Sequence, residues 1–308
     1  MGTAGSRILT LVIAMILDAA FGEPKWIWSR VPHPAVLMGR LIGWIDETYN
    51  VGSHRFEKGF IAMVCLATGA VLIGLGLRQI PFVDVIVLAI LLAQRSLVEH
   101  VSAVAMGLRV SLKEGKRAVA MIVSRDTANM TESDVSRSAI ESAAENMSDG
   151  VIAPIFWFAI AGLPGLLLYK ITNTADSMIG YRTPRHEKFG KAAARLDDLL
   201  NIIPARLTAL MMWAVTPHSN LAGIRRDAPA HRSPNAGWPE AAMAYGHQIA
   251  LSGPRSYDGQ IREFAYVNAA GRTDLGPNDI MAAVSTLWKT WGLALCLAVV
   301  LWLTTGLL

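Results

Sequence analysis

Long runs of apolar residues limit the folds available to this chain, because several are long enough to cross a lipid bilayer. Gly59 to Gln79 and Leu287 to Leu307 are nearly uninterrupted apolar runs. A spanning helix needs about 20 such residues, and it satisfies its backbone hydrogen bonds internally. Charged residues make up 17% of the 308 residues, whereas a soluble domain carries about a quarter. The sequence therefore predicts an all-α, polytopic integral membrane protein.

The apolar segments alternate with polar ones, and we expect them to form a single membrane domain over residues 1–308. The apolar segments are about 8–21, 59–79, 81–94, 151–170, 199–216 and 287–307. The polar segments are 22–58, 95–150, 171–198 and 217–285. Asp18 interrupts the first apolar run, which favours a short or re-entrant helix over a signal peptide. Lys and Arg occur in every long connection, so their distribution does not fix the number of crossings or the orientation.

Helical periodicity also appears outside the longest apolar runs. Val36 to Tyr49 has apolar and charged faces, which predicts an amphipathic helix on the membrane or on the protein. The helix that begins at Pro81 is expected to continue, with a polar stripe, to about Leu112. Thr131 to Asp134 resembles a capping box, although Asp stands in place of the preferred Glu or Gln.

The helix that follows Thr131 is predicted to carry an acidic stripe. At 100° per residue, one face collects polar side chains, namely Ser138, Glu141, Ser142, Glu145 and Asp149. No basic residue follows Arg137 in this helix, so glutamates one turn apart repel each other. An ordinary solvated face is the competing interpretation. Because the stripe runs into an apolar segment, we favour a site in which a cation or a cationic ligand neutralises the acids.

Two further polar stretches are dense in groups that bind metals and phosphates. One runs from Lys170 to Arg182 and the other from Lys188 to Arg206. In the second, Lys191, Arg195 and Asp198 share a helix face. Paired acids beside basic residues suit Mg²⁺ with bound phosphate, because Mg²⁺ usually takes one or two carboxylates plus phosphate oxygens. An internally paired helix end explains the same spacing equally well.

Several familiar site types are excluded by their missing motifs. The chain has no P-loop, no GxGxxG turn, no GxSxG and no HExxH. Its two cysteines, Cys65 and Cys296, lie in apolar runs and form no CxxC, so neither a disulfide framework nor a zinc site is expected. The basic residues are scattered, so we expect no nucleic-acid partner despite the net charge of +4.

A series of short motifs, in order along nearly the whole chain, resembles a known family. They include Leu17 to Pro24, Arg125-Asp126-Thr127, Glu141-Ser142, Asp176-Ser177-Met178, Ala194 to Asp198 and Ser233 to Glu240. The chain resembles the adenosylcobinamide-phosphate synthases of cobalamin biosynthesis, the CbiB/CobD membrane proteins. The resemblance implies a multi-pass ligase of the cell membrane that depends on ATP and Mg²⁺. It implies an amide bond between the carboxylate of adenosylcobyric acid and (R)-1-amino-2-propanol or its O-phosphate.

The resemblance also implies roles for individual residues. The expected catalytic residues are Glu141, Glu145, Asp176 and Asp198, with one of the glutamates accepting the amine proton. The expected ligands of Mg²⁺ are Asp149, Asp176, Asp197 and Asp198. The expected contacts to substrate and phosphate are His33, Asn146, Lys170, Asn173, Arg182, Arg195 and Arg206. A turn-fixing structural role is the alternative for His33. Phosphoryl activation of the carboxylate gives an acyl-phosphate route, and apolar groups near Trp157 are expected to cover the corrin ring.

Two other functions fit the same composition. A membrane transporter also uses broken helices and intramembrane acids, and a non-catalytic signalling membrane protein is the second alternative. The long polar segments, dense in motifs, favour the enzyme. Its expected partners are the corrinoid, the aminoalcohol or its phosphate, ATP and membrane lipid, while homo-oligomerisation is left open.

Val151 to Lys170 is expected to enter the membrane and return, with a bend near Gly162 to Gly165. The polar groups Glu145 and Asp176, which lie on either side of this segment, make chemical sense only on one side of a membrane. Non-helical backbone is tolerated at that depth when protein or water covers it. A single straight helix would contradict this expectation.

Glu145→Gln separates a catalytic stripe from a structural one. If Glu145 is a base or a metal ligand, we expect turnover to fall by roughly two orders of magnitude. The thermal stability of the ligand-free protein should stay the same or rise slightly, because a repulsive charge is removed. Turnover and melting temperature of this one variant are the measurements. A destabilised but active variant would show that the glutamate has a structural salt bridge instead.

Overall fold

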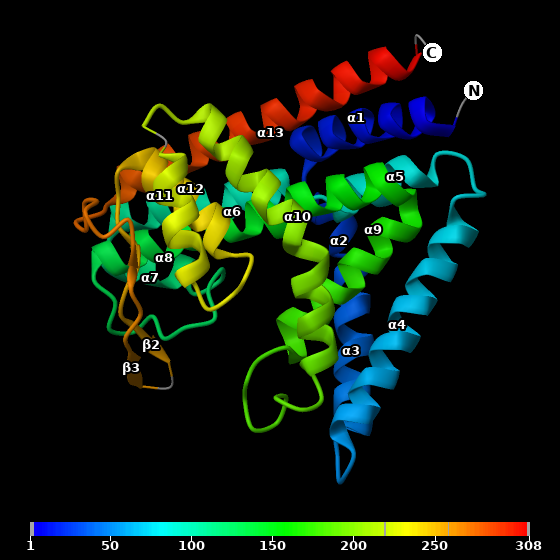
Figure 1. The fold of residues 1–308 in the computed structure, drawn as a ribbon, viewed down its shortest axis with the longest axis horizontal. Helices are drawn as coiled ribbons and strands as arrows, with labels where there is room; N and C mark the ends of the chain where they lie inside the picture. The colour runs from blue at the N-terminus through cyan, green and yellow to red at the C-terminus, as the bar shows by residue number, and fades with distance from the viewer. Residues whose placement is uncertain (1–2, 219, 258, 307–308) are drawn as a thin grey trace. The chain divides into compact units, whose positions relative to one another are not determined.

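Helices dominate the chain (Figure 1). The computed structural model describes residues 3–218, 220–257 and 259–306. By its internal contacts the chain divides into two compact units, each assembled from segments that are distant in sequence. Unit 1 contains the described residues of 1–93, 153–202 and 297–308, and unit 2 those of 94–152 and 203–296. Whether they act as the single membrane domain expected from the sequence stays a prediction.

Unit 1 is built from helices that surround a bent helical segment. Its helices are α1 (Thr3–Phe21), α2 (Lys25–Trp28), α3 (Pro34–Tyr49), α4 (Arg55–Leu77), α5 (Val83–Leu91) and α9 (Ala153–Ile179). The first part of α10 (Lys191–Val215) and the last part of α13 (Pro277–Gly306) complete it. α3, α4, α5 and α1 each pack against α9. The amphipathic helix predicted from Val36 is confirmed as α3, which begins two residues earlier.

The helix α9 folds back on itself at Gly162. This residue has φ 65° and ψ −150°, a conformation that glycine adopts without the steric cost of a side chain. Ala153 and Tyr169 belong to one buried cluster with Leu200, although a straight helix would separate them by about 24 Å. Arg7 donates to the carbonyl of Ile160 at 2.7 Å, next to the break, where the helical partner is lost. The predicted bend is confirmed, and its entry into a membrane stays a prediction.

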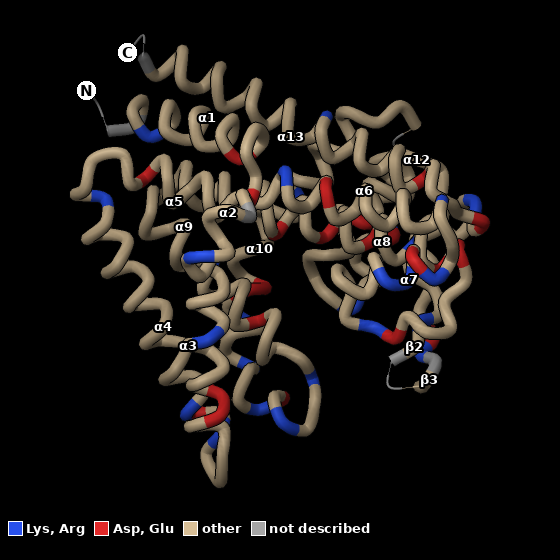
Figure 2. Tube along the Cα trace, turned by 180° about the vertical axis from the view of Figure 1, so that it is seen from behind, with Lys and Arg blue, Asp and Glu red and all other residues tan. Residues whose placement is uncertain are grey.

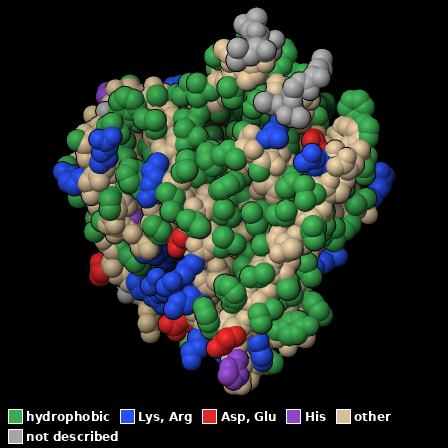
Figure 3. Space-filling model, turned by 45° about the vertical axis from the view of Figure 1, so that its right-hand side comes forward, with side chains coloured by type: hydrophobic (Ala, Val, Ile, Leu, Met, Phe, Trp, Pro, Cys, Tyr) green, Lys and Arg blue, Asp and Glu red, His purple; other side chains and the backbone are tan. Residues whose placement is uncertain are grey.

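The backbone of α4 passes directly against this bend. A Cβ atom added at Gly74 would lie 2.6 Å from both Cα and N of Pro164, so only glycine allows this approach. Between Gly59 and Leu77, α4 carries no charged residue, and this part of its tube is tan in Figure 2. It exposes large apolar side chains such as Phe60 and Leu72, and hydrophobic side chains cover much of the face turned forward in Figure 3. A lipid-facing helix has this composition.

Unit 2 is also helical, with two short hairpin-like strand pairs. Its helices are α6 (Gln94–Val110), α7 (Leu112–Val119), α8 (Glu132–Met147), the π-turn η1 (Ser148–Ile152), α11 (Leu221–Asp227), η2 (Ala228–Ala230) and α12 (Gly237–His247), together with the last part of α10 and the first part of α13. β1 (Leu251–Ser252) pairs with β4 (Tyr266–Val267), and β2 (Arg255–Tyr257) pairs with β3 (Gln260–Arg262), both antiparallel. α8 packs against α6, α7 and α12 and is buried along most of its length. The predicted capping box at its start is confirmed, with both Thr131 and Asp134 bonds formed.

Five segments of the described chain are long and apolar enough to cross a membrane. They are Arg55–Leu77, Val83–Val110, Glu132–Ile179, Lys191–Val215 and Pro277–Thr305. The protein is thus an all-α, polytopic membrane protein, as the sequence predicts. The expectation of one unbroken helix from Pro81 to about Leu112 is wrong, because extended backbone at Leu92 separates α5 from α6. Because of this break, α5 buries its apolar residues in unit 1 and α6 buries its own in unit 2.

Gly74→Ala tests the contact between α4 and the bend of α9. The new methyl group would collide with the backbone of Pro164, so we expect a loss of about 1–3 kcal/mol in stability. Thermal unfolding of the detergent-solubilised protein measures it. Gly69→Ala is the matched control on the same helix, because nothing lies within 4 Å of its added Cβ. Equal melting temperatures for the two variants would contradict the close approach.

Candidate functional site

Unit 2 contains two carboxylates that are almost fully buried. Glu141 lies in the middle of α8 and is 1% exposed, and Glu240 lies in the first turn of α12 and is 2% exposed. Buried carboxylates are costly unless cations or hydrogen-bond donors compensate for the lost water. The groups around this pair therefore decide what it can do.

Two guanidinium groups and one backbone N–H, from two other segments of the chain, meet at Glu141. Arg125 lies 2.9 Å from its Oε2 and Arg255 lies 3.1 Å from the same oxygen. The backbone N–H of Ser252 donates to Oε1 at 2.6 Å. Ser252 adopts a φ of 64°, which is uncommon for a residue other than glycine. The carboxylate thus helps to fix the turn that brings Arg255 into the site.

Arg255 connects Glu141 to the second carboxylate. Its guanidinium lies 3.9 Å from Glu240, and it also donates to the hydroxyl of Ser252 at 3.2 Å. Burial raises the pKa of Glu240 well above its ordinary value, and the negative charge of Glu141 adds to this, although Arg255 opposes it. No hydrogen bond from a described residue reaches Oε2 of Glu240. A carboxyl group of this kind can hold a proton at neutral pH.

His231 completes the cluster from the segment before α12. Its Nδ1 lies 3.1 Å from the backbone N of Ser233 and 3.4 Å from the carbonyl oxygen of the same residue, and its Nε2 lies 3.5 Å from Glu240. Burial, with the positive charge of Arg255, lowers the pKa of His231 to about 4. The imidazole is therefore neutral at pH 7, and we call Arg125, Glu141, His231, Glu240 and Arg255 the buried cluster.

Glu145 lies one turn beyond Glu141 on α8 and is exposed. Arg125, Arg232 and Arg255 are all within electrostatic reach of its carboxylate. The acidic stripe is therefore not the uncompensated row of charges that the sequence suggested. The arginines that compensate these charges come from segments outside α8. Counting the charged residues of α8 alone therefore cannot find them.

The other predicted residues of unit 2 have local partners. Asn146 is exposed and donates to the carbonyl of Ser142 at 2.9 Å, and Asp149 is half-buried in η1. Arg206 donates to Oδ1 of Asn235 at 2.7 Å and to the carbonyl of Pro234 at 3.1 Å. These contacts hold the loop that precedes Glu240. The roles expected for these residues in binding stay predictions.

Unit 1 contains a second polar group, between α9 and α10. Asp197 accepts from the amide of Asn173 at 3.3 Å and from that of Asn201 at 3.0 Å. Tyr169 donates to Asn201 at 3.1 Å. Asp197 and Asn201 are both buried. This amide-bound carboxylate fixes the pairing of the two helices.

Other predicted residues lie on the same two helices or in the segment between them. Asp198 is half-buried within electrostatic reach of Arg182, and the carboxylate of Asp176 lies against Gly180 at the end of α9. Lys170 is half-buried and Arg195 is exposed. Among the described residues, no group of three or more His, Cys, Asp or Glu side chains is arranged to hold a metal ion. The predicted Mg²⁺ ligands stay a prediction.

His33 has the structural role that the sequence offered as its alternative. Its Nδ1 accepts from the N–H of Ala35 at 3.2 Å and so caps α3. Its Nε2 lies 3.2 Å from the carbonyl of Ile90, and its ring contacts Trp28 edge-on at 4.5 Å between centroids. Both ring nitrogens take part in the fold, and substrate binding by His33 is untested.

The sequence missed part of the buried cluster. Glu240 and Arg125 stand inside motifs that carry the family resemblance, but nothing local marks them as neighbours of Glu141. Arg255 and His231 belong to a segment rich in Gly and Pro, without a helical or strand period. The signal that could have found them is the need of a buried glutamate for cationic partners.

The pH dependence of stability tests the burial of His231. Its pKa in the folded protein, about 4, is below the ordinary 6.5, so unfolding takes up a proton between these values. The contribution of this shift to the free energy of unfolding is complete above pH 6.5 and is lost as the pH falls towards 4. At pH 5 the loss is about 2 kcal/mol. We expect His231→Gln to melt with a flatter pH profile than the wild type from pH 7 to 5. His54→Gln, which alters an exposed histidine, should leave the profile unchanged.

Comparison with known proteins places this chain in a family. The family described as "CobD/Cbib protein" matches residues 11–287. The "Cobalamin biosynthesis protein CobD" of Brucella anthropi is 44% identical over 308 residues, covering 93% of this chain and 94% of the relative. The protein of the same name from Rhizobium meliloti is 45% identical over 302 residues, covering 91% and 92%.

A more distant relative gives the same result. The "Cobalamin biosynthesis protein CobD" of Rhodobacter capsulatus is 40% identical over 306 residues, covering 95% of this chain and 97% of the relative. No solved structure matches the chain. A family match over most of the chain, with relatives of nearly equal extent, is enough for an assignment. The chain belongs to the CobD/CbiB family, whose curated members are named for cobalamin biosynthesis.

Proposed function

We propose that this protein is an adenosylcobinamide-phosphate synthase of cobalamin biosynthesis. In this role it forms an amide between the carboxylate of adenosylcobyric acid and (R)-1-amino-2-propanol or its O-phosphate, with ATP and Mg²⁺. Family membership supports the pathway. The observation that supports the chemistry is that Glu145 and three arginines lie next to the buried glutamates Glu141 and Glu240.

Amide formation needs an activated carboxyl group and a base. A free carboxylate repels the amine and has no good leaving group, so phosphoryl transfer from ATP to a carboxylate oxygen supplies one. The nitrogen then attacks the carbonyl carbon, the bond to the phosphate oxygen breaks, and the nitrogen loses a proton. Glu145 is exposed and can take that proton.

The three arginines near Glu145 suit the charge of this reaction. Arg232 is exposed, whereas Arg125 and Arg255 form ion pairs with the buried Glu141. Guanidinium groups bind carboxylate and phosphate oxygens through paired hydrogen bonds. We assign them to the anionic groups of the substrates, with Glu141 and Glu240 as positioning residues. Fixed donors lower the barrier because they need no reorganisation during the reaction.

The polar group of unit 1 fits the requirements of Mg²⁺ by its donor chemistry. It offers carboxylate and amide oxygens without thiolate or imidazole, and Mg²⁺ prefers such oxygen ligands. Asp197 already accepts two amide hydrogen bonds, so Asp176 and Asp198 are the residues that we propose as ligands. When bound, the ion would neutralise phosphate charge. Lys170 and Arg182 add positive charge from the same unit.

The remaining expectations belong to the same proposal. The apolar side chains around Trp157, whose indole donates to the carbonyl of Leu200 at 3.1 Å, offer a surface for part of the corrin ring. The multi-pass chain is proposed to lie in the cytoplasmic membrane, in contact with lipid. Self-association is compatible with this role and is not required by it.

The decisive experiment is an assay of the purified, detergent-solubilised protein. Adenosylcobyric acid, ATP and Mg²⁺ are supplied with aminopropanol or with its phosphate, and the corrinoid products are analysed by mass spectrometry. We expect a mass gain that corresponds to the amide and that requires ATP. Binding of all substrates without any amide product would refute the ligase and favour a non-catalytic protein.

Asp198→Asn tests the proposed Mg²⁺ site. The change keeps the size of the side chain and removes its charge, so we expect ligation to be abolished while the protein stays folded and inserted. Ligation is measured over a range of Mg²⁺ concentrations, and folding by thermal unfolding. Asp274→Asn is the matched control, because it makes the same change at an exposed position in unit 2. Wild-type turnover by Asp198→Asn at limiting Mg²⁺ would remove this residue from the site.

A further inference from the structure

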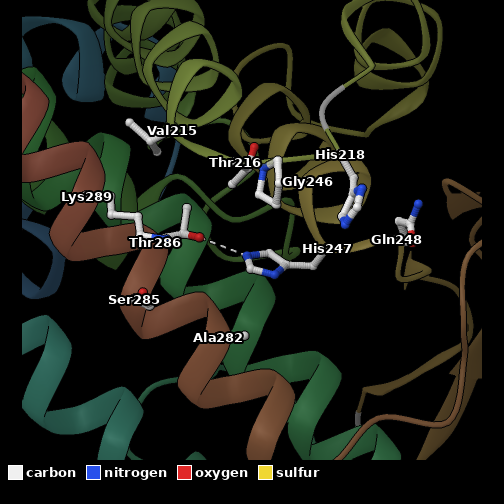
Figure 4. Close-up of a pocket in the computed structure, with 11 residues that line it drawn as sticks. Val215, Thr216, His218, Gly246, His247, Gln248, Ala282, Ser285, Thr286 and Lys289 are labelled. Carbon is white, nitrogen blue, oxygen red and sulfur yellow. Dashed lines mark hydrogen bonds between the residues drawn. The ribbon is translucent and has the colours of Figure 1, made fainter.

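Unit 2 has a cavity of about 360 Å³ away from the buried cluster. It is formed where the ends of α10 and α12 meet the first half of α13 (Figure 4). Its volume lies at the lower end of the range for small-ligand pockets, about 300–1,000 Å³. Glu240 lies in the first turn of α12 and His247 in the last, so the cavity and the buried cluster occupy opposite ends of one helix.

One stripe of α13 supplies polar groups to this cavity. Ser285, Thr286 and Lys289 all line it, and their spacing of three to four residues places them on the same side of the helix. Ser285 and Lys289 are exposed, whereas Thr286 is buried. The stripe therefore presents one ammonium group and two hydroxyl groups to a ligand.

The charge of the lining is positive. Among the residues that the structure describes, Lys289 and His218 line the cavity without a hydrogen bond or ion pair to the protein, and no lining residue is Asp or Glu. The acid that interacts electrostatically with His247 is Asp279. Asp279 accepts a hydrogen bond from the N–H of Gly276 and forms an ion pair with Arg272. No protein carboxylate thus neutralises Lys289 inside the cavity.

His247 adds a hydrogen-bond donor. Its Nε2 lies 2.8 Å from Oγ1 of Thr286, as the dashed line in Figure 4 shows. Burial lowers the pKa of His247, so the ring is neutral at pH 7. The neutral ring of His247 has one N–H, and Thr286 has one O–H. One of these two protons forms the hydrogen bond between the two side chains. Whichever tautomer is present, one donor remains beyond this bond.

We infer that this cavity binds a phosphate group, carried by a small free anion or by a lipid headgroup. One ammonium group, several neutral donors and no acid match a phosphate, which accepts several hydrogen bonds and carries negative charge. Both sources are consistent with the position of Lys289 near the polar end of the apolar run of α13. The site is distinct from the buried cluster and does not depend on the proposed ligation.

The test measures phosphate binding to the full-length, detergent-solubilised protein without other substrates. Inorganic phosphate is titrated by calorimetry into the wild type and into Lys289→Gln. We expect the substitution to weaken binding by about tenfold or more, the usual effect of losing a charge-assisted hydrogen bond. Lys289→Arg keeps the charge and should keep the affinity within a few-fold. Lys113→Gln, at an exposed lysine of α7 in the same unit, should bind like the wild type.

A second arm identifies the source of the phosphate. The same variants are placed in nanodiscs of phosphatidylglycerol or of phosphatidylcholine, and melting temperatures are compared. Stabilisation by phosphatidylglycerol that disappears in Lys289→Gln indicates a headgroup, whereas saturable binding of inorganic phosphate in detergent indicates a free anion. If Lys289→Gln matches the wild type in both arms, or if Lys113→Gln loses as much as Lys289→Gln, the inference is overturned.

Discussion

The ion pairs of Glu141 are the interaction on which the polar part of unit 2 depends. A carboxylate that is 1% exposed is stable only because two guanidinium groups and a backbone N–H replace its water. Removing one partner of such a pair typically costs about 3–5 kcal/mol, since a charge is left buried. Arg255 begins β2, three residues after the turn at Ser252. Its ion pair and the bond from the N–H of Ser252 tie this turn to Glu141.

Unit 1 depends on a different constraint, the reversal of α9. The break at Gly162 removes helical partners from nearby carbonyls, and Arg7 replaces one of them. Because the two arms of α9 then lie close together, Ala153 and Tyr169 can share a core with Leu200. The second arm also presents Asn173 to Asp197 on α10. The bend at Gly162 and the contacts that hold it thus place the polar group around Asp197 next to apolar helices.

The two polar groups differ in how they balance burial against charge. Between α9 and α10 in unit 1, amides satisfy the buried carboxylate of Asp197 without adding charge. In unit 2, arginines compensate one buried glutamate, while Glu240 is held with a raised pKa. The first arrangement favours fixed helix pairing, and the second leaves positive charge next to an exposed acid. This difference is the basis for assigning Mg²⁺ to the acids of unit 1 and anionic substrate groups to the arginines of unit 2.

Local and periodic features were determined by the sequence itself. The apolar runs, the amphipathic α3, the capping box at Thr131 and the bend near Gly162 were all predictable, since each depends on residues close together in the chain. The break at Leu92 and the partners of Glu141 were not, because helix periodicity contains no information about which distant segments will meet. Glu141 and Glu145 were found as acids, but their charges were interpreted as mutual repulsion. Only the tertiary structure showed that Arg125 and Arg255, more than 100 residues apart, converge on one carboxylate, because the cost of burying a charge is met by groups that folding brings together.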